Sequence, residues 1–314
     1  MTKRPTSAQA EEILNRYFPV LDYGFVALKD YMGVDESAAE AARTSYQQGT
    51  VKRGTDGDLI RYLDRHDHGT PFEFVTFKFH CQMPIFVARQ WIRHRMCGFN
   101  EMSGRYSLMP LMFYTPEQEH FAGQSQSNKQ GRSELLAGGY DRHVEKWERL
   151  RVELSQHYQE MTDTDVAREL ARIDLPLSTY TNWYWVINAR SLFNFLRLRC
   201  DEHAQWEIRQ YARTIAGMLQ HAWPILFQAW FDYEYAAITF SRLDCILLGR
   251  FIQTGQTPSM EMALGLGMSK REWDEFVEKA RFKPRDNNFQ LDIAGALPGE
   301  HFEALAKRYT PGNK

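Results

Sequence analysis

The sequence lacks the marks of several protein classes. Its four cysteines, Cys81, Cys97, Cys200 and Cys245, include no CxxC pair, so neither a zinc site nor a disulfide framework is indicated. No apolar run approaches the length that a membrane-spanning helix needs. We therefore expect a reduced, cytoplasmic protein that binds no metal and no membrane.

The glycine-rich fingerprints of common nucleotide-binding folds are also missing. No GxGxxG follows a strand, no GxxxxGK[ST] is present, and GLGMSK at residues 265–270 is neither. The formal net charge is −2, which gives no general attraction to nucleic acid. Any anion site must then be local, and an aromatic content of 14% suits flat ligands or a stiff core.

One short stretch does gather positive charge. WIRHRMCGFNEMSGRYS, residues 91–107, contains Arg93, His94, Arg95 and Arg105, against the single acidic residue Glu101. A solvated helix face would carry acidic partners nearby, and this stretch supplies too few. The pattern favours a site for phosphate-bearing ligands.

The segment before it reads as a strand followed by a helix. VTFKFHCQM, residues 75–83, alternates apolar and polar side chains, which predicts a half-buried strand. Pro84 suits the start of a helix over residues 85–96, ended by Gly98, with Gln90, Arg93 and His94 on one face. Beyond it, residues 99–106 form a loop in which Ser103 and Gly104 allow backbone N–H groups to approach an anion.

The same order recurs over residues 178–220. STYTNWYWVINA predicts a strand, and Asn188 is a candidate N-cap for a helix over residues 189–199. Arg190, Asn194 and Arg197 share one stripe of that helix, and Asp201 is expected to cap the next one. A strand that leads into a helix with a polar face, found twice, suggests two halves of one pocket.

At this point the sequence resembles a known family. Residues 93–103, RHRMCGFNEMS, match the RHR-x7-S signature of the flavin-dependent thymidylate synthases, and residues 65–73, 171–181 and 188–212 are similar to that family too. The resemblance covers residues 20 to 234 and leaves the tail outside. It implies an α+β fold with a twisted antiparallel sheet packed with helices. We expect a catalytic domain over residues 1–234, with a polar insertion near 115–135, and a helical extension over 235–314.

The resemblance also implies a reaction. This family methylates C5 of dUMP to give dTMP, with methylenetetrahydrofolate as carbon donor and FAD, reduced by NADPH, as hydride source. It implies a homotetramer whose active sites lie between subunits. The catalytic assignment is Arg199, which would face the uracil ring and draw charge onto its O2/N3 edge. The substrate-binding positions implied are Gln90, Arg93, Glu101, Ser103, Gly104, Arg105, Arg172 and Arg199. The FAD-binding positions implied are Thr70, Arg93, His94, Arg95, Glu101, Asn188, Arg190 and Asn194, with His68 near the flavin.

Several alternatives stay open from the sequence. The same chemistry on UMP is one, because discrimination of a ribose 2′-OH depends on the fit of a few atoms. A nucleotide-responsive DNA-binding protein is another, because residues 257–280 have the spacing of a helix-turn-helix, with Pro258 opening the first helix and Ser269 capping the second. The balanced charge of the second helix disfavours nucleic acid. Ser103 and Cys97 are interpreted as positioning and packing residues, because a nucleophilic serine needs an adjacent base. The polar insertion is expected to be a flexible loop over the site.

Overall fold

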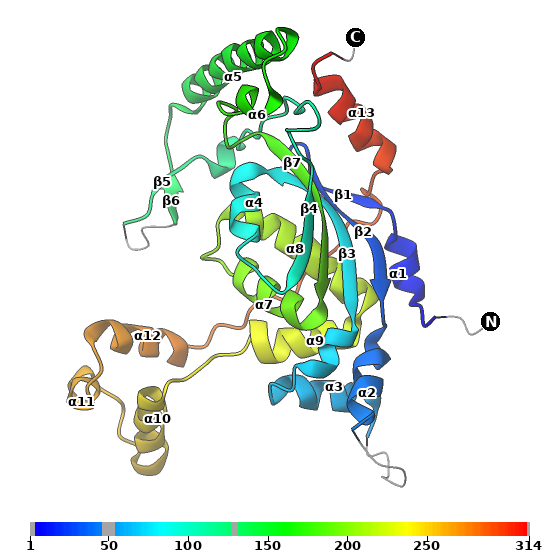
Figure 1. Ribbon diagram of the computed structural model, residues 1–314. Helices are drawn as coiled ribbons and strands as arrows, with labels where there is room; N and C mark the ends of the chain where they lie inside the picture. Colours follow the sequence, from blue (N-terminus) through cyan, green and yellow to red (C-terminus); the bar gives the residue numbers. More distant parts are fainter. Residues whose placement is uncertain (1–3, 46–53, 127–130, 313–314) are drawn as a thin grey trace. The chain divides into compact units, whose positions relative to one another are not determined.

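A five-stranded antiparallel sheet is the centre of the protein. The computed structural model describes residues 4–45, 54–126 and 131–312. The strands run in the order β1-β2-β3-β7-β4, and each neighbouring pair is antiparallel. Their bounds are β1 Tyr17–Val20, β2 Gly24–Met32, β3 Thr76–Pro84, β7 Tyr180–Asn188 and β4 Cys97–Glu101. This sheet, packed with helices, confirms the α+β fold class expected from the sequence (Figure 1).

The central strand β3 follows the predicted alternation. Phe77, Phe79, Cys81 and Met83 are buried, and Lys78 between them is exposed. Gln82 breaks the pattern by being buried on the polar side, where its Nε2 donates a hydrogen bond to a backbone carbonyl 2.6 Å away. Burial of a polar side chain costs little when it is paired in this way.

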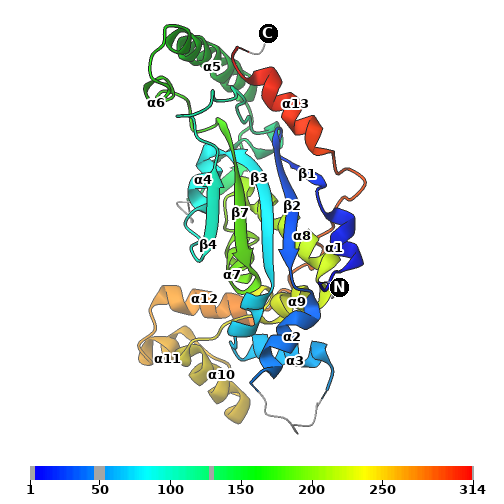
Figure 2. The same cartoon turned by 45° about the vertical axis from the view of Figure 1, so that its right-hand side comes forward.

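Three helices pack against one face of the sheet. They are α4 (Ile85–Trp91), α7 (Ala189–Arg199) and α8 (Trp206–Ala222), and Figure 2 shows the sheet in front of α7 and α8. The ring of Trp91 in α4 lies 5.1 Å from that of Trp185 in β7 and 5.0 Å from that of Phe195 in α7, so aromatic contacts join these two helices to the sheet. On the opposite face of β7, Tyr184 is 39% exposed and Val186 is 40% exposed.

The other helices outside residues 231–288 lie at the two ends of the sheet and beside its β1 edge (Figure 1). They are α1 (Ala8–Ile13), α2 (Asp35–Arg43), α3 (Asp56–Arg65), η1 (Thr70–Phe74), η2 (Gln118–His120), α5 (Tyr140–Asp163), α6 (Arg168–Ala171), α9 (Pro224–Trp230) and α13 (Gly299–Tyr309).

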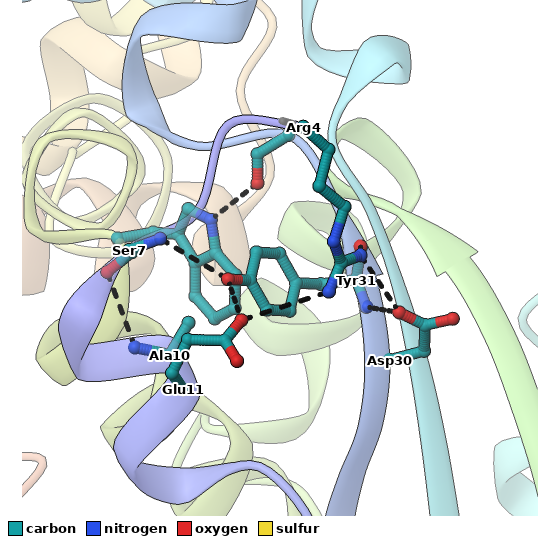
Figure 3. A network of polar contacts seen from close by, with 8 residues as sticks. Arg4, Ser7, Ala10, Glu11, Asp30 and Tyr31 are labelled. Carbon is teal, nitrogen blue, oxygen red and sulfur yellow. Dashed lines mark hydrogen bonds and ion pairs between the residues drawn. The ribbon is translucent and has the colours of Figure 1, made fainter. Parts of the chain in front are cut away.

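A polar network fixes the N-terminal segment to β2. Figure 3 shows Tyr31 at its centre, with its hydroxyl donating to Glu11 Oε1 at 2.6 Å and its carbonyl accepting from Arg4 Nη1 at 2.8 Å. Ser7 caps α1 by accepting the N–H of Ala10. These bonds hold the first helix against the edge of the sheet.

The polar insertion contains a small hairpin, which differs from the single loop expected. β5 (Ala122–Gln124) pairs antiparallel with β6 (Arg132–Leu135). Residues 127–130 lie outside the described residues, so the expected flexibility stays a prediction.

Contacts divide the chain into two units, Met1–Trp230 with Phe289–Lys314 and Phe231–Asn288. The grouping differs from a single extension over 235–314 because the last segment returns to the first unit: the backbone carbonyl of Phe289 would lie 2.6 Å from a Cβ at Gly217 in α8, and Leu297 pairs with Tyr17. Within the described residues, no helix has both the length and the apolar character required to cross a membrane.

The second unit has its own small core. It comprises the π-helix Phe231–Tyr235 and the helices α10 (Arg242–Thr254), α11 (Met260–Gly265) and α12 (Lys270–Ala280), which bury Leu247, Ala263, Met268 and Phe276 together.

The caps of these helices partly follow the sequence. Ser269 caps α12 in a reciprocal pair with Glu272, as predicted, whereas α11 begins after Ser259 and not at Pro258. Lys279 is paired with Asp244 at 2.9 Å, and Arg271 is paired with a carboxylate one turn further along α12. The charges of α12 are thus largely balanced along the helix, which gives little net attraction to a phosphate backbone and weakens the DNA-binding hypothesis.

Candidate active site

The cation-rich segment is a turn and an edge strand, not a continuous helix. The prediction of a helix to residue 96 is wrong beyond Trp91, where α4 ends and residues 93–95 turn away. Met96 takes a positive φ of 66°, and Gly98 lies inside β4 rather than at a helix end. The cause is tertiary: Trp91 is buried in the core, and the residues after the turn pair with β7. Gln90 therefore lies on the helix α4, whereas Arg93 lies in the turn after it and Arg95 in the short segment that leads into β4.

The centre of this region is the contact between His94, which is buried, and Arg199, which is partly buried. Arg199 Nε donates to His94 Nε2 at 2.9 Å, and its Nη2 donates to the carbonyl of Gln90 at 3.4 Å. Burial, reinforced by the charge of Arg199, lowers the pKa of His94 to about 4. The imidazole is thus neutral at pH 7, with its proton on Nδ1, and acts as an acceptor. A guanidinium has five N–H donors, so Arg199 keeps donors for a ligand.

A second network extends from Gln90. Its Nε2 donates to Gln205 Oε1, and Gln205 Nε2 donates to Glu207 Oε2 at 2.9 Å. Glu207 is 1% exposed, and its Oε1 accepts from the hydroxyl of Tyr114 at 3.1 Å and from Arg132 of β6. The hairpin of the insertion therefore contacts the site through a buried carboxylate.

Glu101 and Ser103 lie where β4 ends and the next loop begins. Glu101 Oε1 accepts from the hydroxyl of Thr181 at 2.6 Å. Ser103 Oγ accepts from the backbone N–H of Arg105 at 3.3 Å, and no base bonds to it within the described part of the chain. The Cys97 thiol has its pKa raised by burial, the opposite of what a nucleophilic thiolate requires. These contacts favour the positioning and packing roles for both residues.

The loop after β4 runs beside α6. Gly104 is buried, and a Cβ there would lie 2.8 Å from Met109 Sδ and 3.0 Å from Arg172 Cδ. Arg105 forms an exposed ion pair with Glu169 at 3.2 Å. The structure thus brings Gly104, Arg105 and Arg172 to one place, as the sequence interpretation expects of a nucleotide site.

Another set of expected site residues lies at the start of α7. Asn188 is the N-cap, as predicted, and its Oδ1 accepts from the N–H of Ser191 at 2.9 Å. Arg190 lies directly over Gly69: a Cβ on that glycine would be 1.2 Å from Arg190 Nη1. This close approach places the guanidinium beside Thr70, the first residue of η1.

His68 and Asn194 are exposed members of the same set. The ring of His68 packs edge-on to Tyr62, with centroids 6.1 Å apart. One turn after Arg190 in α7, Asn194 accepts from Arg197 Nη2 at 2.9 Å, so two residues of the predicted polar stripe contact each other.

The expected residues therefore form three local groups. Arg199 contacts both His94 and the backbone of Gln90; Gly104, in the loop over residues 103–105, meets Arg172; and Gly69, between residues 68 and 70, meets Arg190. Cys97, at the start of β4, pairs with Ile187, which directly precedes the N-cap of α7. This pairing brings the turn that carries His94, in the first group, close to the start of α7, where Arg190 of the third group lies. Within the described ranges, no hydrogen bond joins one group to another.

The free cations fit an anionic, phosphate-bearing cofactor. The side chains of Arg93, Arg95 and Arg190 are exposed, and their guanidinium groups make no hydrogen bond or ion pair with the residues that the structure describes. Gly69 lets the Arg190 guanidinium lie flat against the backbone, where any side chain would displace it. Guanidinium groups bind phosphate through paired N–H donors, so a dinucleotide suits this donor set without a glycine-rich loop.

Comparison with known proteins decides the family. Residues 27–225 match the family model described as thymidylate synthase complementing protein. The chain is 45% identical over 283 residues to the flavin-dependent thymidylate synthase of Gluconobacter oxydans, with 88% of this chain and 91% of the relative covered. Its identity to that of Ruegeria pomeroyi is 44% over 284 residues, with 88% and 92% covered. The chain belongs to the flavin-dependent thymidylate synthase family.

Solved structures in the same family share the fold. A UMP/dUMP methylase, PolB from Streptomyces cacaoi bound with 5-Br dUMP, is 31% identical with a TM-score of 0.61, covering 69% of this chain and 97% of that one. PolB bound with 5-Br UMP gives a TM-score of 0.62 over 70% and 99%. Alignments over 88% of this chain cannot fit within its first 234 residues, so the tail lies only partly outside the resemblance, contrary to expectation.

Three residues of the site were not assigned from the sequence: Gln205, Glu207 and Arg132. The first two stand in the segment HAQWE, which was recognised only as part of a motif. Polar residues on both sides of Trp206 at a helix start were the available signal. Arg132 lies in an insertion with no periodic pattern, and nothing in the sequence relates it to a carboxylate 75 residues later.

Proposed function

We propose that this chain methylates C5 of the uracil ring of a uridine monophosphate, converting dUMP to dTMP. The observation that carries the proposal is the Arg199 guanidinium, held by neutral His94 next to the exposed cations of the turn after α4, in a member of this family. Methylenetetrahydrofolate is the proposed carbon donor, and NADPH the proposed reductant of the flavin.

Arg199 is the residue proposed to act on the uracil ring. Carbon C5 is a weak nucleophile, and N–H donors at the O2/N3 edge stabilise the negative charge that develops there during attack. Burial lowers the pKa of Arg199, but a guanidinium in a protein keeps its charge, so the group is a cation. Because His94 accepts from Nε, the guanidinium plane is fixed before substrate arrives.

The remaining nucleotide contacts are proposed for the first two groups. Arg105 and Arg172, with backbone N–H groups at Ser103 and Gly104, suit a phosphate, because these cations flank the loop at Gly104, where the chain packs tightly. The other positions proposed to bind the nucleotide are Gln90, Arg93 and Glu101.

FAD is proposed to bind along the turn after α4 and the start of α7. When bound, it supplies the hydride that completes the methyl group. Its phosphates would be held by Arg190 and Thr70, and its other contacts would come from Arg93, His94, Arg95, Glu101, Asn188 and Asn194, with His68 nearby. The unpaired cations and the Gly69 cradle support this placement.

A homotetramer with active sites between subunits is proposed as the working form. The exposed side chains on the outer face of β7 support this proposal, as does the exposure of Arg93 and Arg95. A cofactor that this chain holds on one side only leaves room for a second chain on the other side. A cytoplasmic location is proposed because all four cysteines are free thiols.

The nucleotide itself has two candidates. UMP is the second, because the solved relative is a methylase whose structures hold both 5-Br UMP and 5-Br dUMP. A competition assay distinguishes them: equal dUMP and UMP, methylenetetrahydrofolate, FAD and NADPH, with methylated products followed by mass spectrometry. Methylation of dUMP supports the proposal. Preferential methylation of UMP would move the chain to the second candidate, and no methylated product with flavin bound would refute both.

A further inference from the structure

Gln90 has an amide whose orientation is fixed by a chain of hydrogen bonds. Glu207 carries acceptors only, so the Gln205 atom 2.9 Å from its Oε2 must be the NH₂ group. Gln205 Oε1 is then left to accept, and the Gln90 atom bonded to it must likewise be the NH₂ group. The consequence is that Gln90 turns its carbonyl Oε1 away from this chain of bonds.

That carbonyl oxygen is available to a ligand. Gln90 Oε1 makes no hydrogen bond in the portion of the chain that the structure describes, and Gln90 is only partly buried. It lies on the helix turn whose backbone carbonyl accepts from Arg199. We infer that Glu207 is a positioning residue that makes Gln90 an obligate hydrogen-bond acceptor, so that Gln90 selects an N–H or O–H donor of the nucleotide.

Glu207, the first residue of this relay, accepts hydrogen bonds from two sides. Tyr114 donates to Glu207 from the core, and Arg132 donates to it from the insertion hairpin. The His120 ring lies against Trp206, between Gln205 and Glu207 in sequence, with centroids 3.6 Å apart. A carboxylate that is 1% exposed needs such partners, because an unpaired buried charge is strongly unfavourable. The hairpin is thereby part of the nucleotide site, through its arginine.

The inference rests on the proposed function and is tested by binding without turnover. Calorimetry would compare dUMP with two analogues that each lack one donor: the N3-methyl derivative, without the uracil N–H, and the 3′-deoxy derivative, without the sugar hydroxyl. We expect one analogue to bind wild-type protein about tenfold more weakly than dUMP, the effect of one lost hydrogen bond. The analogue whose loss of affinity depends on Glu207 identifies the donor that Gln90 accepts.

The decisive variant is Glu207→Gln. It keeps the shape, but its amide can donate to Gln205 and so lets both glutamines reverse, which removes the selection. The analogue's penalty should then shrink to about threefold or less, a coupling that a purely structural role would not produce. Arg132→Ala should also reduce the penalty, and Arg132→Lys should restore part of it. Tyr114→Phe is the matched control, because it removes one bond to Glu207 without reversing the relay, and it should keep the full penalty.

Three outcomes would count against the inference. Equal penalties in wild type and Glu207→Gln would refute the relay while leaving the proposed function intact. Full binding of both analogues to wild type would refute it as well. Failure of wild-type protein to bind dUMP would refute the inference and the proposed function together.

Discussion

Replacing Gly69 with alanine should remove flavin affinity without removing stability. Gly69 has φ −77° and ψ −25°, a conformation that alanine adopts freely. The new Cβ would lie 1.2 Å, 1.9 Å and 2.4 Å from Nη1, Cζ and Nε of Arg190. Those atoms are the far end of an exposed, flexible side chain, so the guanidinium moves aside and the backbone stays.

The magnitudes of the two effects are well separated. A Gly→Ala change at a compatible backbone position stabilises a protein by about 0.4–1 kcal/mol through the unfolded chain, so the free energy of unfolding should stay level or rise slightly. A hydrogen bond to a charged group contributes about 1.5–3 kcal/mol, so loss of the Arg190 contact should weaken FAD binding by roughly 10- to 150-fold. The assay is titration of apoprotein with FAD, followed by flavin fluorescence, alongside urea unfolding.

The chain offers matched controls for this experiment. Gly98→Ala is on β4, where a Cβ meets nothing within 4 Å, and it should bind FAD as wild type does. Arg190→Ala should lose as much affinity as Gly69→Ala, and the double variant should lose no more than either. If Gly69→Ala bound FAD normally while Arg190→Ala did not, the guanidinium would work from another position and the cradle argument would be refuted.

Three further predictions concern single side chains. Burial raises the pKa of Asp35 to about 6, so its contribution to the free energy of unfolding is fully present below its ordinary pKa of 3.8 and is lost as pH rises through 6. Asp35→Asn should remove this pH dependence, worth about 3 kcal/mol, in urea unfolding at pH 4–7. His94, with a pKa lowered to about 4, contributes stability above pH 6.5 that is lost as pH falls toward 4. His94→Gln still offers an acceptor to Arg199 and should abolish that loss, again about 3 kcal/mol, whereas an unchanged acid profile would contradict the assignment. Gly104→Ala brings a methyl 2.8 Å from Met109 Sδ and should shift the loop by tenths of an ångström, raising KM for the nucleotide several-fold with kcat nearly unchanged; an unchanged KM would argue against this loop as the phosphate site.

The regular elements could be predicted because their signals are local. The alternation in β3 placed four side chains in the core, and Asn188 had both the chemistry of an N-cap and a helical pattern after it. Ser269 followed the same logic in the second unit. In each case the residue that decides the structure lies within a few positions of the residues it affects.

The errors in the same region have a common cause in distant pairing. The helix was expected to run to residue 96, but pairing with β7 draws residues 97–101 into a strand in which Phe99 packs on Trp183 while Gly98 and Asn100 face outward. Glycine and asparagine are weak strand formers, so no local pattern indicated a strand here. Asp201 was expected to cap the next helix, but α8 begins only at Trp206 and Asp201 instead accepts from the N–H of His203.

The site shows the same division between local and distant information. Which residues are cationic could be listed from the sequence, but what each one does depends on its neighbour in space. His94 was expected to contact the cofactor, yet its burial and its bond to Arg199 also make it the acceptor that orients the guanidinium proposed to act on the uracil ring. In the proposed relay, Glu207 acts through Gln205 and Gln90 on a ligand that it does not contact itself. A side chain that selects a ligand by being turned in one direction leaves no trace in residue type, because glutamine offers both a donor and an acceptor until its partners choose.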